Sequence, residues 1–284
     1  MAENTDHDTT LITVTENSQE QTFLLANLAP PDHDPESIWS VVYEIQEGEF
    51  ELNHEVEAWL TALRSSPNGR LLAASMDGEL YTYDGRKWVT RDLECEDGLN
   101  DLWVIDDKLA VAVGERGERV MIRGARAEVV RDDRQRRLNA VRGSAAERII
   151  AVGDEGLVWR YDGTNWLEQQ TPTNHALLAV VADAGKDIFV GGADGVLFEL
   201  GPESWREIDM PAEVSIYSLA RFNGKLYAAC GEDGLWVLSG SKLAKAEEYA
   251  LDDLQSARKR MWGVGGTLLG RFDGKRWKTG DLDI

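Results

Sequence analysis

The sequence predicts an all-β fold, a β-propeller of four-stranded antiparallel blades, on three observations. Glycines recur every 39 residues at five positions, Gly78, Gly117, Gly156, Gly195 and Gly234. Each unit between them holds short apolar or alternating runs separated by glycine turns, which is typical of β-hairpins. A repeat of about 40 residues with four such strands has the size of one propeller blade. One blade cannot bury both of its faces, so the units are expected to close into a ring.

The unit around Gly156 shows the elements expected in each blade. The first strand is predicted at residues 138–141, and the second at the apolar run of residues 148–152. A turn of glycine and acidic residues follows at residues 153–156, and residues 157–161 alternate as a third strand. The turn Asp162-Gly-Thr-Asn165 then leads into a fourth strand that starts at Trp166.

The repeat organises the chain into a single domain. Complete units are predicted at residues 59–97, 98–136, 137–175, 176–214 and 215–253, and residues 254–284 form a shortened last blade. Residues 11–58 contain strand-like runs, at residues 22–28, 38–46 and 49–53, and are expected to form a divergent N-terminal blade. This gives seven blades. The alternative is six, with the N-terminal strands completing the short last unit. Residues 1–10 are predicted to be a mobile tail, which leaves residues 11–284 as the propeller domain.

The composition excludes several classes of function. Lys and Arg number 30 against 51 Asp and Glu, a net charge of -21 at pH 7. Such a chain repels phosphate backbones and anionic lipid, so we expect neither nucleic acid nor membrane as a partner. No apolar run is long enough to span a bilayer, and the polar start shows no secretory signal. Two cysteines, Cys95 and Cys230, are too few to staple this domain, which suits a reducing compartment and favours a cytoplasmic location.

The turn before the fourth strand resembles a known repeat family. Tyr83-Asp-Gly-Arg-Lys-Trp88, Tyr161-Asp-Gly-Thr-Asn-Trp166 and Phe272-Asp-Gly-Lys-Arg-Trp277 resemble the Asp-box turn of bacterial-neuraminidase-type (BNR) repeats. The longer string from Val152 to Trp166 is similar to the photosystem-assembly-factor branch of WD/YVTN/BNR-type propellers. The resemblance covers residues 59–284 and implies the propeller fold. In this chain the aspartate and the glycine of the turn are adjacent.

Four tryptophans share one position of the repeat: Trp88, Trp166, Trp205 and Trp277. A residue repeated in blade after blade favours a structural role, because ligand sites in a ring are rarely equal in every blade. We therefore interpret these side chains as plugs that lock the turn against the blade. A platform for stacking carbohydrate rings is the alternative.

No motif for catalysis or cofactor binding is visible. The four histidines have no metal-ligand spacing, and neither a calcium loop, a nucleophile elbow nor a phosphate-binding glycine loop appears. We therefore expect no catalytic residue, no cofactor and no metal, and a protein that is not an enzyme.

The charge is expected to be uneven across the ring. Turns between second and third strands share one face with the connections between blades, and acidic residues outnumber basic ones there. The opposite face carries mostly basic turns. The predicted partner-binding residues of the acidic face are Asp77, Glu94, Glu96, Asp97, Asp154, Glu155, Asp194, Glu232, Asp233, Asp252 and Asp253. The second position of each first strand is expected to line the channel mouth: Thr61, Asn100, Asn139, Leu178 and Tyr217.

These features favour a monomeric, non-enzymatic propeller whose acidic face binds another protein with a basic surface. One version is an immunity or accessory protein that masks a bacterial toxin or secreted effector. The alternative is a carbohydrate-binding or glycosidase-like propeller of the sialidase type. That alternative requires several converging arginines and usually an export signal, and the sequence shows neither.

Overall fold

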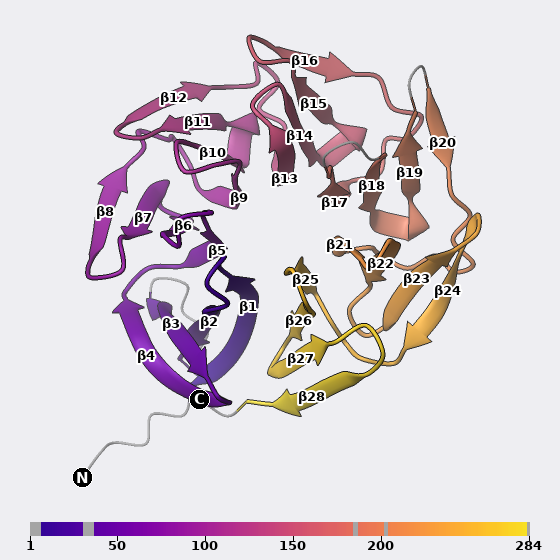
Figure 1. The fold of residues 1–284 in the computed structure, drawn as a ribbon. Coiled ribbons are helices and arrows are strands. Elements are labelled where there is room, and N and C mark those ends of the chain that lie inside the picture. The colour runs from indigo at the N-terminus through magenta and orange to yellow at the C-terminus, as the bar shows by residue number, and fades with distance from the viewer. Residues whose placement is uncertain (1–6, 31–36, 184–186, 202–203, 283–284) are drawn as a thin grey trace.

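A computed structural model describes residues 7–30, 37–183, 187–201 and 204–282. Within these residues the chain forms seven four-stranded antiparallel sheets arranged as a ring (Figure 1). The propeller prediction is confirmed with seven blades, and the six-bladed alternative is wrong because residues 8–56 form a complete sheet of their own. No helix among the described residues has the length and apolarity needed to cross a bilayer.

Each blade is one continuous segment of chain, with its first strand innermost and its fourth outermost (Figure 1). Blade 1 consists of β1 (Asp8–Glu16), β2 (Thr22–Ala29), β3 (Trp39–Gln46) and β4 (Glu49–Val56). Blade 2 consists of β5 (Leu60–Ser65), β6 (Leu71–Ser75), β7 (Glu79–Tyr83) and β8 (Trp88–Asp92). Blade 3 consists of β9 (Leu99–Val104), β10 (Leu109–Gly114), β11 (Arg119–Arg123) and β12 (Arg126–Val130). Blade 4 consists of β13 (Leu138–Ala145), β14 (Arg148–Gly153), β15 (Val158–Tyr161) and β16 (Trp166–Gln169).

The remaining blades follow the same order. Blade 5 consists of β17 (Leu177–Val181), β18 (Ile188–Gly192), β19 (Leu197–Leu200) and β20 (Trp205–Glu207). Blade 6 consists of β21 (Ser218–Phe222), β22 (Lys225–Ala229), β23 (Leu235–Ser239) and β24 (Lys242–Glu247). Blade 7 consists of β25 (Asp253–Ser256), β26 (Met261–Gly265), β27 (Leu268–Phe272) and β28 (Trp277–Asp281). Single 3₁₀ turns, η2 (Glu115–Gly117), η3 (Asp154–Gly156) and η4 (Ala193–Gly195), join the second and third strands of blades 3 to 5.

Two predicted boundaries need correction. β1 begins at Asp8, so residues 8–10 belong to blade 1 and not to a tail, because they pair with β2 at residues 27–29. The rest of the predicted tail, residues 1–6, lies outside the described residues. The last blade is shorter in sequence but keeps four strands. Its first strand begins at Asp253, a residue that the 39-residue spacing assigned to the preceding unit.

The repeated glycines are required by two features of the turn that contains them. All five have a positive φ between 68° and 87°, a conformation that side chains with a Cβ rarely adopt. They also pack against the connection that leaves the same blade. A Cβ at Gly156 would lie 2.1 Å from the carbonyl oxygen of Thr173, and one at Gly117 would lie 2.4 Å from Cβ of Asp132. Any other residue would force the connection away from the turn.

The Asp-Gly turns have an equally local cause. Asp162 accepts hydrogen bonds at Oδ1 from the backbone N–H groups of Thr164 and Asn165, both at 2.8 Å. Gly163, which follows Asp162 in the turn, has a φ of 101°. The same two bonds form at Asp84 and Asp273, and these backbone donors hold the pKa of all three carboxyl groups below the usual range. The aspartate therefore fixes the hairpin by itself, without any ligand.

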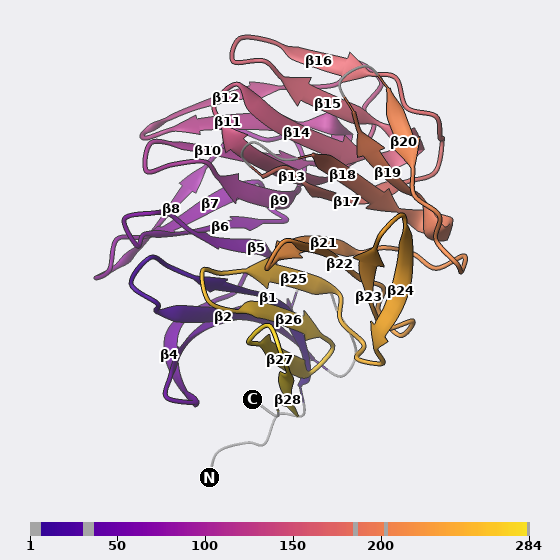
Figure 2. The ribbon, with the colours of Figure 1, turned by 45° about the vertical axis from the view of Figure 1, so that its right-hand side comes forward.

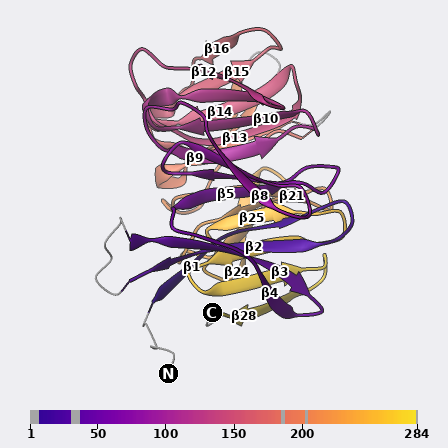
Figure 3. The same cartoon turned by 90° about the vertical axis from the view of Figure 1, so that its left-hand side faces the viewer.

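The hydrophobic core is divided among the interfaces between blades. Each buried cluster combines residues of two neighbouring sheets, for example Val111 of blade 3 with Ile149 of blade 4. The ring closes in the same way, where Leu11 and Leu24 of blade 1 pack against Trp262 of blade 7. A turned view shows β1 and β2 lying beside β25 and β26 (Figure 2), and β25 again lies next to β2 in the side view (Figure 3). No strand is exchanged between the first and last sheets of the described chain. The seam is held by this packing together with polar contacts, such as the backbone hydrogen bond from Leu11 to Gly266 at 2.8 Å and the ion pair between Arg260 and Glu16 at 3.1 Å.

Candidate protein-binding face and channel mouth

One face of the ring is built from the turns between second and third strands and from the connections between blades. Gly78 in the first kind of turn contacts Cys95 and Asp97 in the second kind of segment. The backbone amide of Glu115 likewise donates to the carbonyl of Gly98 at 2.9 Å. These contacts bring the two kinds of segment together on one face, the face predicted to be acidic.

The innermost strands line the central channel (Figure 1), and the predicted channel-mouth residues lie along it. Four of them are the second residue of a first strand, and Tyr217 immediately precedes β21. Three of these polar residues link neighbouring blades. Thr61 donates to the carbonyl of Leu99 at 2.7 Å, and Asn100 and Asn139 donate to Leu138 and Leu177 at 2.9 and 3.0 Å. At the predicted channel-mouth positions, Thr61, Asn100 and Asn139 thus join consecutive blades. Leu178 and Tyr217 have no such donor to the next strand.

Deeper in the channel a buried ionic cluster joins three blades. Asp101 accepts from Arg64 Nη2 at 3.0 Å, from the backbone amide of Val141 at 2.9 Å, and from Arg142 Nη1. The guanidinium carbons of Arg64 and Arg142 lie 5.8 and 4.7 Å from the ring centroid of Trp103. The two arginines therefore converge, which sequence spacing did not predict. Asp101 offsets one of their two positive charges, and the cavity beside them measures about 170 Å³, too small for a sugar chain.

Asp253 belongs to this channel wall. Its carboxylate accepts from the hydroxyls of Thr13 at 2.6 Å and Ser218 at 3.1 Å. Arg64 in turn donates to Thr13 at 3.3 Å, which extends the polar network of the channel to the ring-closing seam. Asp253 is thus engaged inside the channel, unlike the turn residues with which the sequence grouped it.

Many of the predicted partner-binding acids are paired within the molecule. Asp97 and Glu96 form ion pairs with Arg116, and Glu96 also lies 3.4 Å from Arg131. Asp194 contacts Nδ1 of His175 at 2.9 Å. Asp154 accepts from the amide of Asn139 at 3.0 Å. The ion pairs with arginine offset the charge of Glu96 and Asp97, and the other two contacts hold the side chains of Asp194 and Asp154 in place.

A different part of the face keeps its negative charge. Glu232, Asp233 and Asp252, which we call the acid sector, form no ion pair with any basic side chain among the described residues. Burial, followed by the charges of Glu232 and Asp253, raises the pKa of Asp252 above its usual range. Asp77, Glu94 and Glu155 also have no basic partner in the described chain, but they lie singly in other blades.

An aromatic side chain adjoins the acid sector. The ring of Tyr217 packs over Gly231, with its Cε2 atom 3.1 Å from where a Cβ at that glycine would lie, and Asp252 Oδ1 is 3.3 Å from the same point. Tyr217 is 48% exposed despite this contact. Trp59, in the connection between blades 1 and 2, is 40% exposed. Both residues immediately precede a first strand, so the face carries half-exposed aromatic rings as well as the carboxylates of the acid sector.

The chain is similar to other proteins mainly in its fold. No family model matches it. The immune protein Tsi7 of Pseudomonas aeruginosa is 31% identical over 100 residues, which is 34% of this chain and 31% of Tsi7. The alignment thus spans about a third of the length of that protein.

Solved structures resemble the whole ring. Sqt1 from Chaetomium thermophilum aligns with 97% of this chain and 84% of its own, with a TM-score of 0.71 and 15% identity. YCF48 from Cyanidioschyzon merolae aligns with 95% and 97%, with a TM-score of 0.73 and 13% identity. A chain of the mitotic checkpoint complex aligns with 96% and 87%, with a TM-score of 0.69 and 13% identity. At these identities the likeness shows a propeller fold.

The four repeated tryptophans contact the preceding blade on the outer part of the ring. Trp88 donates to Asn53 Oδ1 at 2.9 Å, and Trp205 donates to the carbonyl of Gln170 at 2.7 Å. Trp166 lies 5.8 Å from the guanidinium carbon of Arg119, and the ring centroid of Trp277 lies 6.1 Å from that of Tyr249. Each also packs against an aromatic side chain of its own hairpin: Tyr83, Tyr161, Phe198 and Phe272.

The cysteines and acidic clusters offer little chemistry. Cys95 and Cys230 are free thiols, and burial raises the pKa of each to about 12, which disfavours the reactive thiolate. For Cys95 the neighbouring Glu118 adds to this effect. Among the described residues no group of three or more His, Cys, Asp or Glu side chains is placed to hold a metal ion.

Proposed function

We propose that this propeller is a monomeric, non-enzymatic protein that binds another protein through the acid sector and Tyr217. One observation carries the proposal. Elsewhere on the face Glu96 and Asp97 form ion pairs with arginine, whereas Glu232, Asp233 and Asp252 form no ion pair among the described residues and lie together beside a half-exposed tyrosine. Aromatic anchors bordered by complementary charge are typical of the residues that dominate binding energy at protein interfaces.

The proposed partner has a basic surface. Free carboxylates attract such a surface at long range, while the ring of Tyr217 supplies contact area once the two proteins meet. The local likeness to the immune protein Tsi7 supports a narrower version, in which the chain neutralises a toxin or secreted effector. The free thiols suit action in the cytoplasm. An origin of the repeats among Asp-box-like propellers belongs to the same proposal and rests on the Asp-Gly turn and its following tryptophan.

The test begins with the tagged full chain, used to capture its partner from cells that produce it. The purified partner is then titrated against the chain and against a triple variant, Glu232→Gln, Asp233→Asn and Asp252→Asn. A matched triple change on the outermost strands, Glu51→Gln, Glu55→Gln and Glu128→Gln, controls for net charge. Binding is expected to weaken with rising salt and with the first triple change only. Tyr217→Ser should cost about 2 kcal/mol of binding free energy.

Two results would contradict the proposal. One is a stoichiometric complex whose affinity is the same in both triple variants. The other is an affinity that does not depend on salt. The immunity version has its own readout: the partner produced alone should arrest growth, and the wild-type chain should restore growth better than the chain with Tyr217→Ser. A partner that is harmless by itself would remove that version and leave protein binding intact.

A further inference from the structure

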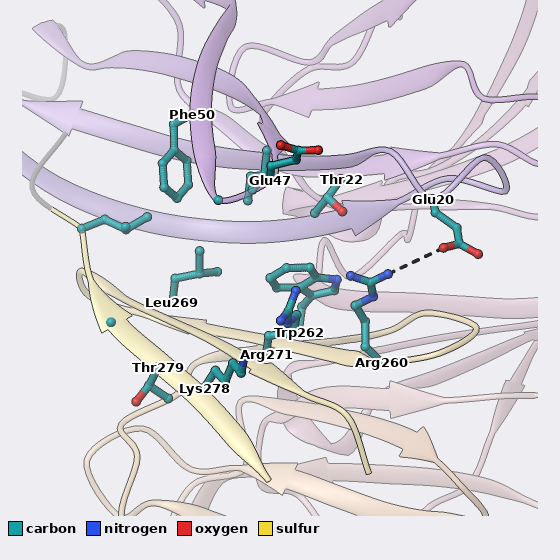
Figure 4. A pocket seen from close by; sticks show the side chains of 14 residues that line it. Glu20, Thr22, Glu47, Phe50, Arg260, Trp262, Leu269, Arg271, Lys278 and Thr279 are labelled. Carbon is teal, nitrogen blue, oxygen red and sulfur yellow. Dashed lines mark ion pairs between the residues drawn. The ribbon is translucent and has the colours of Figure 1, made fainter. Parts of the chain in front are cut away.

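A cleft of about 570 Å³ lies at the ring-closing seam, outside the acidic face (Figure 4). Its walls come from β2, β3 and β4 of blade 1 and from β26, β27 and β28 of blade 7. We call it the seam cleft. Its volume falls in the range of small-molecule sites, which is about 300 to 1,000 Å³.

Two cations stand side by side on the blade 7 wall. Arg271 and Lys278 are direct partners in the antiparallel register of β27 and β28, so their side chains lie on the same face of the sheet. Like charges at such a position destabilise a sheet. Neither forms an ion pair with an acidic side chain in the described part of the chain. The corresponding pair of blade 5, Glu199 and Arg206, has opposite charges and forms an ion pair.

Apolar and aromatic side chains complete the cleft. The buried ring of Trp262 lies 5.9 Å from the guanidinium carbon of Arg271. Leu269 projects from β27, and Phe50 projects from β4 on the facing wall (Figure 4). The combination of apolar walls with a few convergent charged groups is the usual composition of a ligand site.

The acids of the cleft lie away from this cation pair. Glu20 forms ion pairs with Lys259 and Arg260, which lower its pKa and neutralise its charge. Glu47 lies at the tip of the β3–β4 hairpin, on the blade 1 wall. A negative ligand group would be repelled by Glu47 and attracted by Arg271 and Lys278. A bound ligand is therefore expected to point its negative group toward the blade 7 wall.

We propose that the seam cleft binds a small organic anion. Its carboxylate or phosphate group would be held by Arg271 and Lys278, and its flat apolar body would lie against Trp262, Leu269 and Phe50. Such a ligand relieves the repulsion between the two cations. It also contacts two sheets that share no strand, so binding stabilises the closed ring by an amount that rises with the logarithm of ligand concentration once that concentration exceeds Kd.

The experiment uses 2-naphthoate and phenyl phosphate as probes, with 2-naphthamide as the uncharged analogue of the first. Affinity is measured by calorimetric titration on the full chain, and the melting temperature is recorded with and without probe. The variants are Arg271→Gln and Lys278→Gln. The control is Lys275→Gln, which removes a charge from the exposed turn between β27 and β28.

At least one charged probe is expected to bind saturably and to raise the melting temperature. Arg271→Gln and Lys278→Gln should each weaken that binding about tenfold, because each removes a charge-assisted hydrogen bond. The same variants, without probe, should melt no lower than the wild type, since a like-charge pair has been relieved. Binding unchanged by Lys275→Gln completes the expected pattern. The proposal is overturned if neither charged probe binds, if 2-naphthamide binds as tightly as 2-naphthoate, or if all three variants lose affinity equally.

Discussion

Arg136 holds Glu168 in a two-pronged ion pair, with Nη1 2.9 Å from Oε1 and Nη2 3.0 Å from Oε2. The same guanidinium donates from Nε to Asp132 at 2.9 Å. Asp132 and Arg136 belong to the connection that leaves blade 3, whereas Glu168 lies in the outermost strand of blade 4. The side chain of Arg136 therefore links the connection after blade 3 to the sheet of blade 4.

Replacing this arginine should destabilise the fold. Arg136→Gln leaves the buried carboxylate of Asp132 without its charged partner, and breaking such a pair typically costs about 3 kcal/mol. Urea unfolding followed by tryptophan fluorescence would measure the loss. Arg134→Gln, at an exposed position of the same connection, should change the free energy of unfolding by less than about 0.5 kcal/mol. Equal losses of unfolding free energy in the two variants would show that the ion pair itself does not stabilise the fold.

The same contact predicts a dependence on pH. Bonds from Arg136 lower the pKa of Glu168, and they lower that of Asp132 although burial alone would raise it. A carboxyl group with a lowered pKa contributes stability above its unfolded value, about pH 4, and loses it as the pH falls through the folded value. The gap in unfolding free energy between wild type and Arg136→Gln should therefore be full at pH 7 and narrow below about pH 4. A gap that stays constant from pH 7 to pH 3 would refute the linkage.

The repeated glycines can be tested by a pair of alanine substitutions with similar backbone strain. Gly156 has a φ of 69° and no room for a Cβ, whereas Gly124 has a φ of 60° and open space around it. Gly124→Ala should cost about 1 kcal/mol from strain alone. Gly156→Ala should cost clearly more, because the connection at Thr173 must move. Thermal unfolding of both variants measures the difference, and a smaller effect at Gly156 would contradict the packing argument.

The repeated tryptophans are predicted to stabilise the ring. The ring centroid of Trp166 lies 5.2 Å from that of Tyr161, and it packs against the core shared by blades 3 and 4. Trp166→Ala should lower the free energy of unfolding by roughly 3 kcal/mol. Leu167→Ala, at the next residue and 47% exposed, is the control and should cost little. An unchanged melting temperature for Trp166→Ala would favour a ligand-stacking role for this position.

The repeat made the fold predictable from the sequence, because each of its features has a local cause. Gly156 needs a positive φ, and Asp162 closes its own hairpin through backbone hydrogen bonds. Such requirements recur wherever the turn recurs. Blade 1 was predicted only from short runs that alternate or are apolar, so its start at Asp8 was missed by three residues.

The candidate site was much less predictable, since charge counts by turn ignore which side chains meet. Glu96 and Asp97 looked equivalent to Glu232 and Asp233, yet only the first two have arginines within reach. The two arginines that pair with Asp101, Arg64 and Arg142, come from the blades on either side, and no spacing within one repeat reveals them. Tyr217 was noticed as a channel-mouth position, but the place of its ring depends on the absence of a side chain at Gly231, which the sequence pattern does not reveal.

The closure of the ring without a shared strand bears on where the chain can begin and end. No described blade borrows a strand from another, so the junction between blades 7 and 1 differs from the other six chiefly in lacking a peptide connection. Cutting the chain at another connection and joining the present ends through a linker would leave every sheet intact. The architecture therefore does not dictate the location of the termini, and whole blades are the natural units by which such a ring can be gained, lost or reordered.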